Sequence, residues 1–241
     1  MRGIRDIEVV VFDVLGTLVD ESSGLRAAIR EAAPTSDEAA VDDWVSLWQQ
    51  HCEREQQRIR QRHRPYANTE VIDAEAARRV AEQAGVDDPS VVDRLARAGQ
   101  RLPPWDDSVA GLEHLARRLP VIGLSHASRS ALLRLNAHAG LRWHLALSAE
   151  AVHAYKPAPE VYRLAVDTAG CPPERVLMVA AHAWDLRGAR EVGLRTAYVR
   201  RPTGDPPTGS DDFDGRFDGL DQLIGVLSAG QVGSSSPRRG A

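Results

Sequence analysis

The chain has 241 residues, a formal net charge of -4 and two cysteines. A small net charge, with acidic and basic residues in similar numbers, gives no reason to expect a nucleic acid or a membrane surface as partner. Two cysteines are too few for a disulfide framework. No apolar run approaches membrane-spanning length and no leader pattern opens the sequence, so we expect a cytoplasmic protein.

Strand-like apolar runs alternate with helical patterns along most of the chain. The runs cover residues 9–12, 120–124, 176–180 and 196–199, and amphipathic segments cover residues 109–118, 130–139 and 159–169. This alternation predicts an α/β fold, a doubly wound parallel sheet with helices on both faces. Gly140, Gly170 and Gly193 stand where helices would end in a left-handed cap.

The stretch from residue 21 to residue 100 contains only helical patterns. Trp44, Leu47, Trp48 and His51 recur at the spacing of one helix face, and residues 75–84 and 90–98 predict further helices. We therefore expect an α-helical cap of residues 21–100, inserted into a core of residues 1–20 and 101–227, which would exclude water from a site beneath it. The small, polar residues 228–241 predict a mobile C-terminal tail.

Polar side chains follow the predicted strands at or near their ends, or lie in the loops between them. They are Asp13, Thr17, Ser125, His126, Lys156 and Asp185. Because the carboxyl ends of parallel strands meet at one crevice, we expect these side chains to converge there.

A carboxylate at such a position is a candidate nucleophile, and Asp13 is the first of the set. An ammonium such as that of Lys156 would keep Asp13 ionised by lowering its pKa. Hydroxyls and backbone N–H groups after Thr17 and Ser125 would hold an anionic substrate. Asp185 would anchor Lys156 or help to activate a water.

Four ordered motifs resemble the haloacid dehalogenase superfamily, and most closely its (S)-2-haloacid dehalogenases. They are Phe-Asp-x-x-Gly-Thr-Leu at residues 12–18, Leu-Ser at 124–125, Tyr-Lys-Pro-x-Pro-x-Val-Tyr at 155–162 and Ala-Trp-Asp at 183–185. The resemblance extends to about residue 227. It implies a Rossmann-like core with a helical cap, hydrolysis of a carbon–halide bond in a small carboxylic acid, no cofactor, and a homodimer, a state common in that family.

The resemblance also implies a role for each residue of the set. Asp13 would displace halide from C2 of a 2-haloalkanoate and form an ester, which water would hydrolyse with help from Lys156 and Asp185. Thr17 would orient Asp13. The substrate-binding residues would be Ser125, His126, Gln49, Tyr162, His182 and Trp184.

Leu15 separates this chain from the phosphatases of the superfamily, which carry a second aspartate there as an acid and base and bind Mg²⁺. Halide is a weak base that leaves without a proton, so a dehalogenase can dispense with that acid. Leucine therefore favours carbon–halogen cleavage over phosphoryl transfer, and we expect no metal site.

The predicted cap departs from the family pattern beside Trp48. The family places a substrate- and halide-binding arginine where this chain has Gln49, whose amide brings no positive charge. At about 100° per residue, Arg54 and Arg58 lie roughly 140° and 180° around the helix from Gln49. Arg60 lies on nearly the same face but roughly 16 Å further along, so we expect none of the three to replace the missing charge.

Two histidines form a second departure. His126 and His182 stand where the family often has asparagine, and Ala180 and Ala181 replace two serines. The imidazoles would face each other across the site as donors or as a base for water, or would serve as structural hydrogen-bonding groups.

Three other functions remain open on the sequence alone. The same Asp13 nucleophile would suit another small electrophile, such as a strained ring acid, in a site that lacks the arginine. A Mg²⁺-dependent phosphatase is disfavoured by Leu15, and a non-catalytic protein would use the closed site to bind a small acid.

Overall fold

The computed structural model describes residues 4 and 6–232, although not the side chains of residues 230–232. Helix α9 (Leu220–Val232) includes residues 228–232, the first five residues of the predicted tail. The helix persists because Leu220, Leu223 and Leu227 are buried in the core. Residues 233–241, the rest of the predicted tail, lie outside the described residues.

The core is a six-stranded sheet in the order β3-β2-β1-β4-β5-β6, in which every neighbouring pair of strands is parallel. The strands are β1 (Val9–Asp13), β2 (Val121–Ser125), β3 (Leu145–Ser148), β4 (Val176–Ala180), β5 (Arg195–Val199) and β6 (Gly215–Phe217). β1 lies between β2 and β4, which places its carboxyl end at the middle of the sheet. The predicted α/β fold is confirmed.

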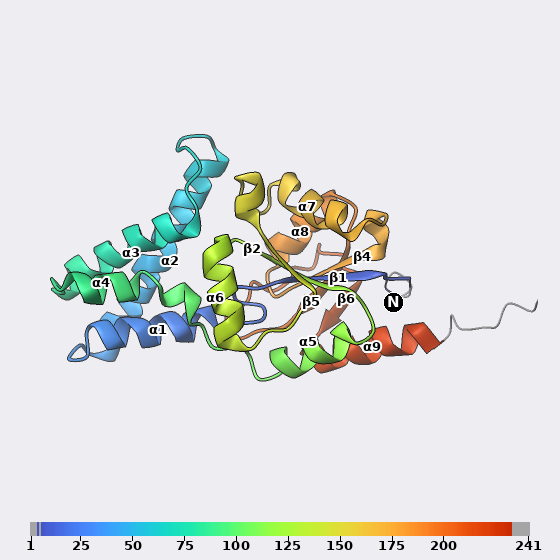
Figure 1. Cartoon of the computed structure of the whole chain (residues 1–241), viewed down its shortest axis with the longest axis horizontal. Coiled ribbons are helices and arrows are strands. Elements are labelled where there is room, and N and C mark those ends of the chain that lie inside the picture. The colour runs from blue at the N-terminus through green and yellow to red at the C-terminus, as the bar shows by residue number, and fades with distance from the viewer. Residues whose placement is uncertain (1–3, 5, 233–241) are drawn as a thin grey trace, which may run out of the picture.

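Helices cover both faces of this sheet (Figure 1). One face packs on α9 and on α5 (Ser108–Ala116) and α6 (Arg129–Ala139), the other on α7 (Pro159–Ala169) and α8 (Ala183–Glu191). Side chains of β1 point alternately to the two faces of the sheet: Val10 and Phe12 pack in the hydrophobic cluster on one face, and Val9 and Val11 pack in the cluster on the other. The short 3₁₀ helices η2 (Ala149–Val152) and η3 (Pro173–Arg175) lie in connections.

Residues 21–100 contain helices and no strand. They form α1 (Glu21–Ala32), α2 (Glu38–Arg60), α3 (Thr69–Ala84), α4 (Pro89–Leu95) and η1 (Ala98–Gln100). Asp20, Asp37, Asn68 and Asp88 each accept a backbone N–H at the start of one of the four α-helices, as N-caps do. This unit has its own hydrophobic cluster and lies beyond the carboxyl end of β1 (Figure 1). We propose it as the cap.

None of the helices among the described residues combines the length and the apolar character that a membrane crossing needs.

Candidate active site

Three charged side chains meet at the carboxyl end of β1. Nζ of Lys156 lies 2.8 Å from Oδ1 of Asp13 and 2.8 Å from Oδ2 of Asp185. Asp13 is the last residue of β1, Asp185 lies in the first turn of α8, and Lys156 lies in the loop before α7. The lysine and Asp185 are buried, and the Asp13 side chain keeps 10% of its surface exposed. The predicted convergence of these residues is therefore present.

The ion pairs determine the protonation of this trio. Burial alone would raise the pKa of Asp13, but Lys156, His182 and Thr17 outweigh it and hold that pKa below its ordinary value. Burial, aided by the charge of Asp13, raises the pKa of Asp185 despite its contact with Lys156. Burial opposes the charge on Lys156, yet the two carboxylates raise its pKa. Asp13 is thus the carboxylate that stays ionised, as a nucleophile must.

Hydroxyl groups hold both carboxylates in place. Oγ1 of Thr17 donates to Oδ2 of Asp13 at 2.7 Å and accepts the N–H of Ala181 at 2.9 Å. The hydroxyl of Tyr162 lies 2.7 Å from Oδ1 of Asp185, to which it donates. Both hydroxyl residues are fully buried, so they orient the charged groups from behind.

A cavity of about 630 Å³ opens in front of Asp13. The predicted site residues in its wall are Asp13, Gln49, His126, Lys156, His182 and Trp184. The remaining predicted residues, Thr17, Ser125, Tyr162 and Asp185, are fully buried and lie outside that wall. The oxygen of Ser125 accepts the N–H of Ala127 at 3.1 Å, an internal contact at the start of the loop that leads into α6.

Both histidines line the cavity and lie near the ring of Trp184. The ring centroid of His126 lies 6.1 Å from that of Trp184, and the centroid of His182 lies 5.9 Å from it. Nε2 of His126 accepts the backbone N–H of Lys156 at 2.8 Å. Burial, with the charge of Lys156, lowers the pKa of His126 to about 3. His126 is therefore a neutral acceptor whose Nε2 is already engaged.

His182 packs against the turn that follows β1. Gly16 adopts a left-handed φ of 76°, and a Cβ added there would lie 2.6 Å from Nε2 of His182. Only glycine allows the imidazole to come this close to the loop that carries Thr17.

Helix α2 supplies the cap side of the cavity. Gln49, Glu53, Gln56 and Arg60 all line it, at the i, i+4, i+7 and i+11 spacing of one helix face. Nε2 of Gln49 donates to Oγ of Ser22 at 3.3 Å. Arg60 lines the same cavity as Gln49, about three turns further along α2, so whether it replaces the missing charge stays a prediction.

The sequence profile of the haloacid dehalogenase-like hydrolases matches residues 7–193. The chain belongs to this family. It is 32% identical to the (S)-2-haloacid dehalogenase H-109 of Pseudomonas putida over 82% of this chain and 88% of that one. Its structure is similar to the L-2-haloacid dehalogenase PA0810, with a TM-score of 0.84 at 29% identity over 92% of this chain and 99% of that one. For the L-2-haloacid dehalogenase of Xanthobacter autotrophicus the TM-score is 0.79 at 26% identity, over 92% and 99%.

Membership of this hydrolase family confirms the resemblance predicted from the four motifs. Each of these similar structures spans 92% of the chain, so the match takes in most of the helical residues 21–100 as well as the sheet.

Sequence reasoning missed two carboxyl side chains in the cavity wall, Glu53 of α2 and Glu21. Glu21, the first residue of α1, lines the wall together with Asp13. Burial raises the pKa of Glu21, and the charge of Asp13 adds to that rise while His182 opposes it. The available signal was the N-cap at Asp20, because capping places the next residue in the first helical turn, close to the loop after β1.

Among the described residues, no group of three or more His, Cys, Asp or Glu side chains is arranged to hold a metal ion. Between Asp13 and Asp185 stands the ammonium of Lys156, at 2.8 Å from each. Position 15 is occupied by leucine, whose side chain offers no ligand atom.

Proposed function

We propose that the chain hydrolyses short 2-haloalkanoic acids through a covalent ester on Asp13. The observation that carries the proposal is an ionised Asp13 at the wall of the cavity, held by Lys156 and Thr17, with Leu15 in place of an acid. A leaving halide takes the bonding electrons of the broken carbon–halogen bond and needs no proton. The similarity to proteins named (S)-2-haloacid dehalogenases supports the same chemistry.

In the first step a carboxylate oxygen of Asp13 attacks C2, an ester bond forms and halide leaves. In the second step water attacks the carbonyl carbon of that ester. The products are the 2-hydroxy acid, halide and one proton, and the Asp13 carboxylate is restored. Lys156 keeps Asp13 ionised before the attack, and Thr17 holds its second oxygen.

The water-activating role falls to His182 in this proposal. Nε2 of His126 is engaged with the backbone of Lys156, and Asp185 is fully buried outside the cavity wall. The imidazole of His182 lines the cavity beside Gly16, close to the Asp13 loop. Asp185 therefore acts through Lys156, as a positioning residue held by Tyr162.

The test measures halide released from chloro-, bromo- and fluoroacetate and from both enantiomers of 2-chloropropionate. We expect release by the natural chain and none by Asp13→Asn, with both proteins folded by circular dichroism. Mass spectrometry after acid quenching should find the added acyl mass on the peptide that contains Asp13. Absence of halide from every substrate, in a folded protein, would overturn the dehalogenase proposal.

Glu21 favours a second candidate, the opening of a strained ring acid. A carboxyl group with a raised pKa beside the nucleophile can protonate an alkoxide leaving group, which halide chemistry does not require. Asp13 would attack a ring carbon of oxirane-2-carboxylate, Glu21 would protonate the released oxygen, and water would hydrolyse the ester to a dihydroxy acid. Formation of glycerate from that substrate, lost in Glu21→Gln, would establish this function; no glycerate would exclude it.

A further inference from the structure

A second cavity of about 760 Å³ adjoins the reaction cavity on the side where α2 ends. Its walls come from the end of α2 with the turn after it, and from the loop that leads into α7. Arg60 and Pro157 line both cavities. We call the second cavity the basic groove, for the cations in its wall.

Cations on the cap side of the basic groove have no carboxylate partner among the described residues. Arg60 and Arg62 line the groove, and neither takes part in the ion pairs or side-chain hydrogen bonds formed within residues 4 and 6–232. Partial burial lowers the pKa of Arg60 against the charge of Glu53. The carboxylate in the groove wall is Glu160. The balance of charge therefore favours an anion.

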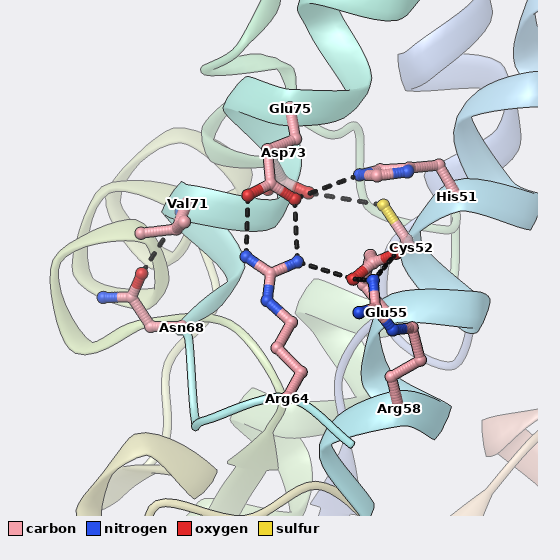
Figure 2. A network of polar contacts seen from close by, with 9 residues as sticks. All are labelled: His51, Cys52, Glu55, Arg58, Arg64, Asn68, Val71, Asp73 and Glu75. Atoms are coloured by element: carbon pink, nitrogen blue, oxygen red, sulfur yellow. Dashed lines mark hydrogen bonds and ion pairs between the residues drawn. The ribbon is translucent and has the colours of Figure 1, made fainter. Parts of the chain in front are cut away.

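Arg64 fixes this cationic turn in place. Its guanidinium lies 2.7 Å from Glu55 of α2 and 2.6 Å from Glu75 of α3 (Figure 2). Arg62 sits between the end of α2 and this anchor, with a left-handed φ of 59°. Arg64 is neutralised by its two partners, so the charge that faces the groove comes from Arg60 and Arg62.

Aromatic rings also line the groove and lead toward Asp13. Six rings follow one another with centroids 5.0 to 6.1 Å apart, from the groove into the reaction cavity. In order they are His153, Tyr66, Tyr155, His126, Trp184 and His182. The hydroxyl of Tyr66 is buried and has no hydrogen-bond partner among the described residues. The tyrosine rings Tyr66 and Tyr155, in the same groove as these cations, suit a small acid with an aliphatic body.

We propose that the basic groove binds small carboxylate anions and delivers them to Asp13, with Arg60 and Arg62 as the binding cations. This inference rests on the proposed function for the identity of the substrate. Arg60 would hold the anion where the two cavities meet, and Arg62 would capture it at the outer end. Such fields raise association rates and weaken with salt.

The kinetic test compares Arg60→Gln and Arg62→Gln with Arg54→Gln, an exposed arginine of α2 that lines neither cavity. At low ionic strength we expect each groove variant to lose about fivefold or more in kcat/KM for 2-chloropropionate, and the loss to shrink below about twofold in 0.5 M salt. Arg62→Gln should keep its kcat. Equal kcat/KM and equal salt dependence in all four proteins would overturn the proposal.

A binding measurement decides the case if the chain proves not to be a dehalogenase. Calorimetry with propionate, which has no leaving group, reports the affinity for a carboxylate without turnover, and propionamide is the uncharged control. We expect weaker propionate binding in Arg60→Gln and Arg62→Gln, unchanged propionate binding in Arg54→Gln, and unchanged propionamide binding in all three. Propionate affinity equal in all variants, with matching thermal midpoints, would refute the groove whatever the halide assay shows.

Discussion

His126 makes the stability of this protein depend on pH in a way that one substitution can isolate. Nε2 of the ring accepts the Lys156 N–H at 2.8 Å. Protonation would set a ring N–H against that backbone N–H, beside the ammonium of the same lysine. Burial and this charge accordingly lower the pKa of His126 to about 3.

The lowered pKa of His126 makes the protein less stable as the pH falls. In the unfolded chain a histidine titrates near 6.5, so from about pH 6.5 down to about pH 3 the unfolded state binds one proton more than the native state. The free energy of unfolding therefore falls as the pH falls, by up to about 1.4 kcal/mol per pH unit. Between pH 7.5 and pH 4.5 the loss from His126 amounts to about 2.7 kcal/mol. A native pKa anywhere below about 4 gives nearly the same figure.

Urea unfolding at pH 7.5, 6.5, 5.5 and 4.5 measures this loss in the natural chain and in His126→Asn. Carboxylates titrate in both proteins, so the difference between their unfolding free energies isolates the imidazole. We expect the natural chain to lose about 2.7 kcal/mol relative to the variant on going to pH 4.5. His138→Asn, at an exposed position on α6, serves as control and should follow the natural chain. A constant difference between His126→Asn and the natural chain would refute the neutral, engaged imidazole.

Three further predictions test the surroundings of the nucleophile. Tyr162→Phe removes the 2.7 Å hydrogen bond to buried Asp185 and should cost about 1–3 kcal/mol of unfolding free energy, measured in urea. Gly16→Ala forces a side chain to φ 76° and within 2.6 Å of the His182 ring, so halide release should fall at least tenfold and stability by about 1–3 kcal/mol; unchanged kinetics would contradict the role of His182. Glu21→Gln removes a carboxyl that shares the cavity with Asp13 and repels an anionic substrate once it is ionised, so at a pH above the raised pKa of Glu21 the variant should raise kcat/KM for anionic haloacids by up to about tenfold; a fall there would show that Glu21 helps to bind them.

The strands that sequence analysis found are those with a strong local signal. Residues 9–12 form an apolar run that ends on a charge, and the structure continues β1 by one residue to Asp13. β3 and β6 were not predicted because they are short and lie at the edges of the sheet, where burial is incomplete. Leu145 of β3 is 44% exposed. Such strands are specified by their neighbours in space rather than by their own residues.

Helix α2 is longer than the sequence pattern predicted. It extends to Arg60, whereas the apolar spacing indicated only the turns around residues 44–51. The last turns bury Glu55, which a sequence pattern assigns to solvent. Arg58 and Arg64 neutralise that carboxylate, and Arg64 comes from beyond the end of the helix. Burial of a charge through a distant partner leaves no mark on the local pattern.

The site likewise contains contacts that the sequence predicts and contacts that it does not. Motifs at strand ends were sufficient to bring Asp13, Lys156 and Asp185 together, because the parallel sheet itself places them. The engagement of His126 with Lys156 joins residues 30 positions apart, and the entry of Glu21 into the cavity depends on how α1 leaves β1. Neither contact follows from spacing along the chain.

The positions of the charges give the cavity two regions with different tasks. Near the nucleophile the cap presents an amide, Gln49, and a carboxyl, Glu21, whereas its cation, Arg60, stands where the cavity meets the basic groove. An anion is therefore attracted at the entrance more strongly than beside Asp13, and a cation placed in the groove contributes mainly to capture. Chemistry at C2 then depends on the buried trio, whose one ammonium is shared by two carboxylates. Substitutions in the groove should consequently alter kcat/KM and its salt dependence, whereas substitutions around Asp13 should alter kcat at every salt concentration.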